Sequence, residues 1–175
     1  MSWIKRLRSS ADVRGFRLDS RDMVAAVCLA LAAFTLYLYT LPPSVLDGDS
    51  GRWQYVSHVL GVPYPTGYPG LAVLGKLWLL SVPVGTVAYR MSLFSAALGS
   101  VHAGLSYVLF RKAVCGRWAA LIGAALFATL PTTWWWSISI KSYPLNLIFV
   151  TLCFLLLIWW SEAGEERILK GFAFV

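Results

Sequence analysis

Long uncharged apolar runs alternate with short polar segments along most of the chain. Residues 23–41 form the first run, which as a helix would extend over roughly 28 Å and so cross the hydrocarbon core of a bilayer. Further runs near residues 88–110, 118–136 and 145–160 predict three more spans, and residues 171–175 resemble the start of another. The pattern therefore predicts an all-α membrane protein with about four transmembrane helices.

The charges between these runs predict the topology. Residues 1–22 form a basic tail too short to fold alone, and we expect it in the cytoplasm because Lys and Arg favour the cytoplasmic side. The same rule places Arg111, Lys112 and Arg117 in the cytoplasm, which makes residues 42–87 an outer loop. The remaining transmembrane domain then extends over residues 23–175.

A shorter apolar piece interrupts this outer loop. It covers residues 70–82 and contains Lys76, and if it crossed the membrane, the cations at residues 111–117 would lie outside. We therefore expect it to be a short interfacial or re-entrant helix. Trp53, Val56, Val59 and Leu60 have helical spacing and predict a second surface helix, capped at its start by Asp49 or Ser50.

Composition agrees with a membrane protein. With 58% hydrophobic residues, 13% charged residues and a mean hydropathy of +0.67, the chain is too apolar for an ordinary soluble domain. Its net charge of +7 comes from residues that flank apolar runs, without the basic stripe of a nucleic-acid-binding protein. Membrane lipid is therefore the expected partner, and nucleic acid is not.

The most polar loop runs from Asp47 to Pro69 and is rich in Gly and Pro. Backbone that leaves the helical pattern must lie in water or in a protein-lined cavity, because hydrocarbon cannot satisfy its polar groups. In the expected topology, Asp47 and Asp49 are the only carboxylates on the outer side. They are spaced as an Asp-x-Asp pair, so a divalent metal held by Asp47 and Asp49 is one interpretation and a helix cap without chemistry is another.

Several motifs in this order resemble one family. They are Gly48-Asp49-Ser50-Gly51, then Gly61-Val62-Pro63-Tyr64-Pro65-Thr66-Gly67-Tyr68-Pro69, then Leu74-Gly75-Lys76, residues 87–96 and residues 134–146. The combination resembles the multi-spanning proteins grouped as domain of unknown function 2723, which are similar to the N-terminal part of GT-C glycosyltransferases and include an animal protein O-mannosyltransferase. The resemblance covers nearly the whole chain after the basic tail.

The resemblance implies a glycosyltransferase reaction on the outer face. Such enzymes pass a sugar from a polyprenyl-phosphate carrier to an acceptor, using an acidic residue of the first outer loop, which in this chain is Asp49. A carboxylate there accepts the proton of the acceptor hydroxyl or orients a metal, and nearby cations stabilise the leaving phosphate. The substrate-binding candidates are Arg52, Tyr64, Tyr68, Arg90 and Lys141.

Three residues depart from the family pattern. Arg52 and Lys141 replace glutamates, and Tyr64 replaces a histidine. The departures leave a second interpretation open, a non-catalytic membrane protein that binds lipid-linked sugars or assembles with envelope proteins. A transporter would be expected to show a repeat or paired intramembrane charges, and neither is evident. We expect a bacterial inner membrane protein with a cytoplasmic N-terminus, and we expect these residues to be the N-terminal part of a longer chain.

Overall fold

The computed structural model describes residues 18–65, 67–114 and 116–163, and this part of the chain is helical without strands. The predicted all-α class is confirmed. Most of the basic tail and the expected further span at residues 171–175 lie outside the described residues. The helices are α2 (Ser20–Tyr39), α3 (Asp49–Val59), α4 (Pro69–Ser81), α5 (Val87–Val114), α6 (Arg117–Thr129), α7 (Pro131–Ile138) and α8 (Tyr143–Ala163).

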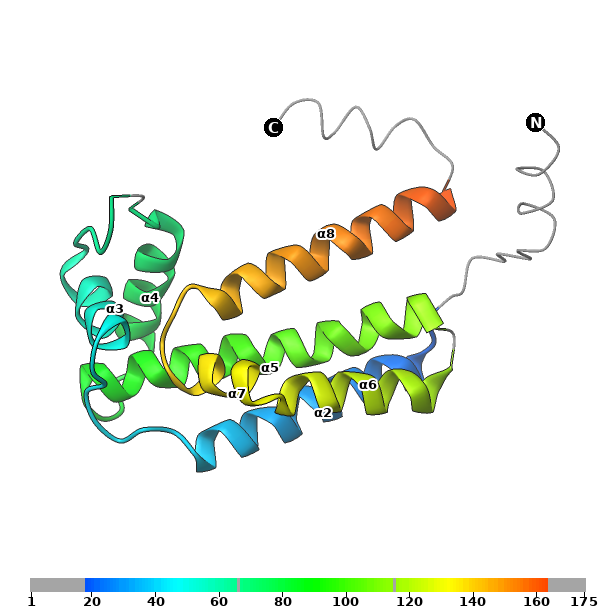
Figure 1. Cartoon of the computed structure of the whole chain (residues 1–175), viewed down its shortest axis with the longest axis horizontal. Helices are drawn as coiled ribbons and strands as arrows, with labels where there is room; N and C mark the ends of the chain where they lie inside the picture. The colour runs from blue at the N-terminus through cyan, green and yellow to red at the C-terminus, as the bar shows by residue number, and fades with distance from the viewer. Residues whose placement is uncertain (1–17, 66, 115, 164–175) are drawn as a thin grey trace, which may run out of the picture.

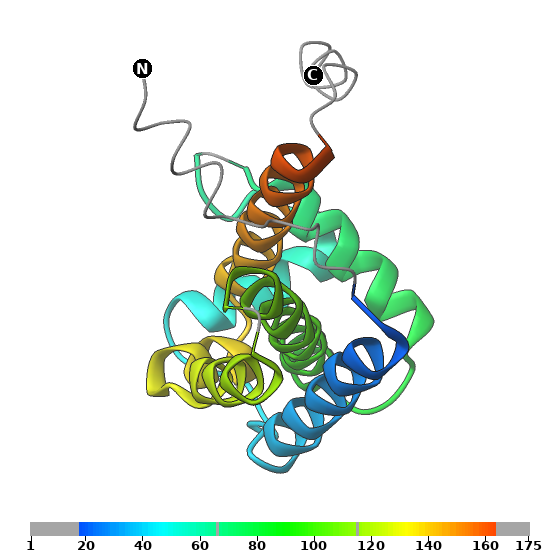
Figure 2. The ribbon, with the colours of Figure 1, turned by 90° about the vertical axis from the view of Figure 1, so that its right-hand side faces the viewer.

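Helix α5 is the centre of the bundle. It contacts each of the other six described helices, and the view along its axis shows it between α2, α6 and α8 (Figure 2). Three helices are long and apolar enough to cross a membrane, namely Ser20–Tyr39, Val87–Ala113 and Tyr143–Trp160. The chain is therefore a membrane protein built around one long central span.

The span expected at residues 118–136 is broken into α6 and α7. Leu130 between them is extended, with φ −55° and ψ 136°, because the ring of Pro131 disfavours a helical conformation at the preceding residue. The two helices follow one another along α5 and together run most of the length of the bundle (Figure 1). Three long single helices and one broken pair of shorter helices thus run along the described bundle.

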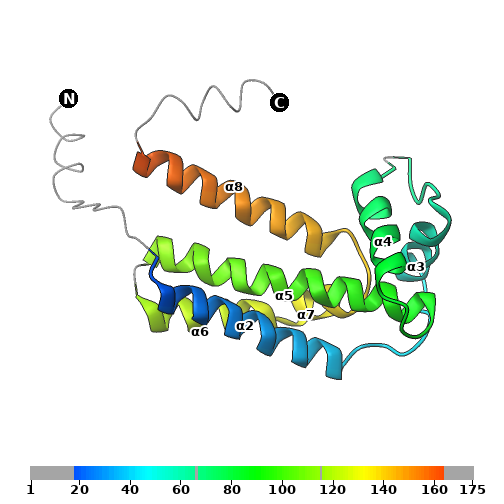
Figure 3. The same cartoon turned by 180° about the vertical axis from the view of Figure 1, so that it is seen from behind.

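The short helices predicted in residues 42–87 are present. Helices α3 and α4 lie beside one another at one end of the bundle, next to the first turns of α5 (Figure 3). Gly75 lets them pack closely, since a Cβ atom there would lie 2.5 Å from Oγ of Ser57 on α3 and 2.8 Å from Cε of Met91 on α5. Residues 42–87 therefore form a helical cap on one end of the molecule.

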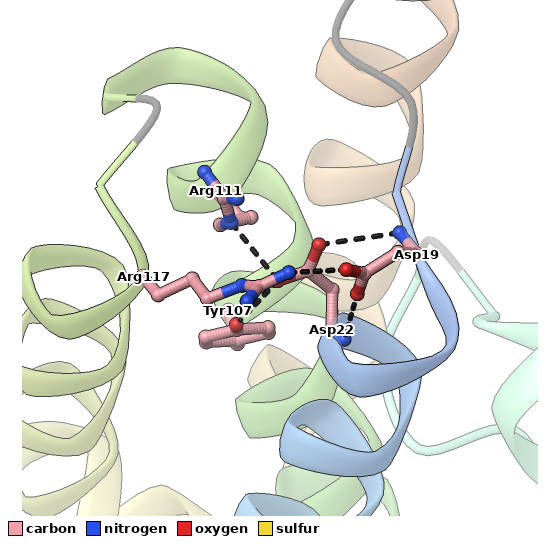
Figure 4. Close-up of polar contacts among 5 residues, drawn as sticks. All are labelled: Asp19, Asp22, Tyr107, Arg111 and Arg117. Atoms are coloured by element: carbon pink, nitrogen blue, oxygen red, sulfur yellow. Dashed lines mark hydrogen bonds and ion pairs between the residues drawn. The ribbon is translucent and has the colours of Figure 1, made fainter.

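A buried ion cluster fastens the opposite end (Figure 4). Asp22 on α2 is fully buried. Its Oδ1 atom accepts hydrogen bonds from Tyr107 Oη at 3.1 Å, Arg111 Nε at 3.0 Å and Arg117 Nε at 3.1 Å. A buried carboxylate needs such partners to offset its lost hydration, so the cluster joins α2, α5 and α6.

Candidate functional site

The loop that carries Asp49 enters α3 without a side-chain cap. Gly48 is the N-cap residue, with φ 65°, and no side chain bonds the first turn. The expectation that Asp49 or Ser50 caps this helix is therefore wrong. Asp49 is the first helical residue, and its carboxylate instead accepts a hydrogen bond from the phenol of Tyr64.

This carboxylate lines a pocket that lies between the α3–α4 cap and the loop before α8. The pocket has a volume of about 160 Å³, smaller than the roughly 300–1,000 Å³ of complete ligand sites. It therefore has the size of a subsite or of one wall of a larger site. Its lining residues are Asp49, Trp53, Tyr64, Tyr68, Lys141, Ser142 and Tyr143.

Three aromatic rings form one side of the pocket. The ring centroids of Trp53 and Tyr64 lie 5.8 Å apart, those of Trp53 and Tyr68 5.4 Å, and those of Tyr64 and Tyr68 6.3 Å. Trp53 is 3% exposed, whereas Tyr68 is 37% exposed. These tilted and edge-on contacts are favourable aromatic geometries, so Trp53 anchors a rigid surface that Tyr68 presents to solvent.

The three departures from the family pattern all lie around Asp49. The guanidinium of Arg52 lies 4.8 Å from the ring centroid of Tyr64, and its Nη1 atom donates to the carbonyl of Pro63 at 3.3 Å. Tyr64 in turn donates to Asp49, and Lys141 lines the same pocket. Among the described residues, Lys141 has no hydrogen-bond or ion-pair partner.

The Tyr64 phenol stays protonated at neutral pH. Its hydrogen bond to Asp49, followed by burial and the charge of that carboxylate, raises the pKa of Tyr64 above the ordinary value of 10.0. The protonated phenol is a donor. Tyr64 is therefore the donor and the Asp49 carboxylate the acceptor of this hydrogen bond. The remaining lone pairs of the carboxylate can accept a further hydrogen bond from a ligand.

Two residues that were not among the candidates position this loop. Gln54 is 3% exposed, and its Nε2 atom donates to Ala88 O at 3.4 Å and to Ser92 Oγ at 3.2 Å on α5. Its Oε1 atom accepts from the backbone N–H of Leu46 at 3.1 Å. Gly51 permits the close approach, since a Cβ atom there would lie 2.4 Å from Leu46 O.

Arg90 does not reach the pocket. Its Nη1 atom donates to the carbonyls of Leu79 at 2.9 Å and Val82 at 3.3 Å. These carbonyls lie at the C-terminal end of α4, where backbone acceptors lack helical partners. Arg90 therefore ties α4 to α5, and the structure gives it no contact with the other candidate residues.

Asp47 also lies apart from the pocket. It is exposed and does not line the cavity. No group of three or more His, Cys, Asp and Glu residues suited to a metal occurs within the described ranges. Because hard divalent cations take several oxygen ligands, Asp47 and Asp49 would supply only part of a coordination shell. A metal held by this pair stays a prediction.

The described helices pack around α5, and a carboxylate, tyrosines and a lysine gather around one pocket at one end of the bundle. This arrangement is that of a multi-spanning membrane protein with a polar site at one end. Residues 49–175 match the protein O-mannosyl-transferase TMEM260 N-terminal domain family, and the chain belongs to this family. No solved structure matches the chain.

Two curated relatives cover most of the chain. The mouse protein O-mannosyl-transferase TMEM260 is 36% identical over 147 residues, which are 84% of this chain and 20% of the relative. The Dictyostelium discoideum protein of the same name is 30% identical over 152 residues, 85% of this chain and 19% of the relative. The chain thus spans about a fifth of the length of these relatives.

Proposed function

We propose that this chain supplies one wall of a membrane glycosyltransferase site, in which a sugar passes from a polyprenyl-phosphate carrier to an acceptor hydroxyl. The observation that carries the proposal is the gathering of Asp49, Tyr64 and Lys141 around one pocket. The relatives' names support a mannosyl group as the sugar and a protein as the acceptor.

Asp49 is the general base of the proposed reaction. The acceptor oxygen forms a bond to the anomeric carbon of the sugar while the bond from that carbon to the phosphate oxygen breaks. The acceptor proton goes to Asp49, and the bonding electrons leave with the polyprenyl phosphate. Tyr64 orients the carboxylate through its hydrogen bond, so that the free lone pairs of Asp49 face the incoming hydroxyl.

Lys141 and Arg52 stabilise the leaving phosphate in this proposal. Together with Asp49 they give the region a net charge of about +1, which suits an anionic carrier. Lys141 lines the pocket, whereas Arg52 is not among the lining residues and lies over the ring of Tyr64, which lines it. Replacing two family glutamates by cations would therefore strengthen the hold on the phosphate, and Tyr68 would offer an aromatic surface to the sugar.

The proposed site lies on the outer side of the membrane. Arg111, Lys112 and Arg117 lie at the end of the bundle opposite α3 and α4, and positive charges favour the cytoplasmic side. A cytoplasmic N-terminus follows from the same argument. The expectation of a bacterial inner membrane stays a prediction, and the two relatives come from a mouse and a slime mould.

The test compares Asp49→Asn with Asp47→Asn in proteoliposomes loaded with polyprenyl-phosphate mannose and a serine- and threonine-containing peptide. Both changes remove one carboxylate from the same loop, but only Asp49 lines the pocket. We expect Asp49→Asn to lower transfer by about 100-fold or more, the range of general-base catalysis, while Asp47→Asn transfers like the unchanged protein.

In a preparation whose unchanged protein transfers mannose, equal activity of the two variants would contradict the role of Asp49. Carrier binding without any transfer by the unchanged chain would favour the alternative of a non-catalytic protein that binds lipid-linked sugars. Binding is therefore measured on the same preparations with the labelled carrier alone.

A further inference from the structure

A second pocket lies at the other end of the bundle, far from Asp49. It has a volume of about 280 Å³ and opens between the first turns of α2 and α6. Two arginines and a tryptophan in its lining are exposed, whereas the apolar residues Ala25 and Leu121 are partly buried. The lining residues are Arg21, Ala25, Tyr107, Arg117, Trp118 and Leu121.

The two helices contribute to this pocket in the same way. Arg21 and Ala25 on α2 are four residues apart, and so are Arg117 and Leu121 on α6. Residues with this spacing lie on one face of a helix, one turn apart. Each helix therefore contributes to the lining a cation near its N-terminus and an apolar side chain one turn further along the helix.

The two arginines differ in their partners. Arg117 is fixed by Asp22, with its Nε atom 3.1 Å from Oδ1, and by an ion pair with Asp19. Arg21 is exposed and has no hydrogen-bond or ion-pair partner among the described residues. Figure 4 shows Arg117 reaching across to α2, where it is held in place. One cation is thus preorganised and the other is available to a ligand.

We propose that this pocket binds an anionic membrane phospholipid through its phosphodiester group. The charged side chains of the cluster and the pocket, Asp19, Asp22, Arg21, Arg111 and Arg117, sum to +1, which matches a single negative charge. Ala25 and Leu121 line the pocket with apolar surface suited to an acyl chain. Trp118 is 77% exposed, as is typical of an aromatic residue at the level of lipid headgroups.

The charge and the lining together exclude other anions as the best occupants. A free phosphate would gain nothing from the apolar walls, and a polyphosphate would exceed the available positive charge. The site does not depend on the proposed glycosyl transfer, because none of its residues lines the Asp49 pocket. Bound lipid would bridge α2 and α6 at the end where the ion cluster already joins them.

The test uses the whole chain in detergent with equimolar dioleoyl phosphatidylglycerol and dioleoyl phosphatidylcholine, and native mass spectrometry counts the retained lipids. Arg21→Gln removes the unpartnered cation from an exposed position. Lys112→Gln is the matched control, since it removes one charge at the same end of the bundle but does not line the pocket. Leu121→Trp fills the pocket and keeps every charge.

We expect the unchanged chain to retain phosphatidylglycerol preferentially. Arg21→Gln should lower this preference by about five-fold, the effect of one basic residue at an anionic surface. Leu121→Trp should lower it as well, Lys112→Gln should not, and inorganic phosphate should not displace the lipid. Four results would each overturn the proposal. Two concern variants: an equal loss of the phosphatidylglycerol preference in Arg21→Gln and Lys112→Gln, or an undiminished preference in Leu121→Trp. The other two are displacement of the lipid by inorganic phosphate and the absence of any preference in the unchanged chain.

Discussion

Gly51 offers a sharp test of how the Asp49 loop is built. An alanine Cβ atom at this position would lie 2.4 Å from the carbonyl oxygen of Leu46, closer than any unstrained contact. The Leu46 backbone cannot easily move away, because its N–H donates to the buried Gln54 side chain at 3.1 Å. Overpacking of this kind costs about 1–3 kcal/mol, partly offset by up to about 1 kcal/mol from the better helix propensity of alanine.

Gly51→Ala should therefore lower the unfolding free energy by about 1–2 kcal/mol. It should also increase hydrogen exchange at residues 46–54, because the loop must separate from α3. Gly70→Ala is the matched control, since Gly70 lies in the first turn of α4 and a Cβ atom there meets nothing within 4 Å. Thermal unfolding in detergent and exchange mass spectrometry measure both effects. A Gly51→Ala protein as stable and as protected from exchange as Gly70→Ala would show that Gly51 is not needed for the contact with Leu46.

Two further predictions concern the ion cluster and Tyr64. Asp22→Ala should lower the free energy of unfolding by about 3–5 kcal/mol, since it removes a buried carboxylate that two arginines share. Arg117→Gln should lower it much less in the same unfolding assay, because the Arg117 side chain is 42% exposed. The raised pKa of Tyr64 means that its bond to Asp49 is fully present below pH 10.0 and is lost only as pH rises through the folded pKa. The tyrosinate absorbance of Tyr64 is the difference between the unchanged protein and Tyr64→Phe. Its titration midpoint should lie above the ordinary value of tyrosine and should fall toward that value in Asp49→Asn. A midpoint that Asp49→Asn leaves unchanged would contradict the hydrogen bond.

The helical spans could be predicted because each is a long apolar run whose length matches a bilayer. Pro131 indicates the break between α6 and α7, but the apolar residues on both sides of it form one run with the length of a single span. The sequence pattern places Asp22 in the tail and does not predict its burial, because the arginines that bind its carboxylate are about 90 residues further along the chain.

The candidate site was predicted only in part. The family motifs indicated Asp49, Tyr64, Tyr68 and Lys141, and the structure brings these four to one pocket. Arg90 is expected there as a cation within the 87–96 motif, at the outer end of its helix, yet its guanidinium donates to a carbonyl at the end of α4. Trp53 and Gln54 were missed because their roles depend on tertiary contacts that local periodicity does not report. Ser142 and Tyr143, the neighbours of Lys141, were missed as well.

We propose that the pocket around Asp49 and Lys141 binds the phosphate of a polyprenyl carrier. The most direct measurement is the affinity of polyprenyl phosphate for the unchanged chain and for Lys141→Gln, with Lys76→Gln as the control cation outside the pocket. We predict that Lys141→Gln weakens binding about ten-fold, the value of one charge-assisted contact, while Lys76→Gln does not. Equal affinities for the unchanged chain and Lys141→Gln would contradict the account.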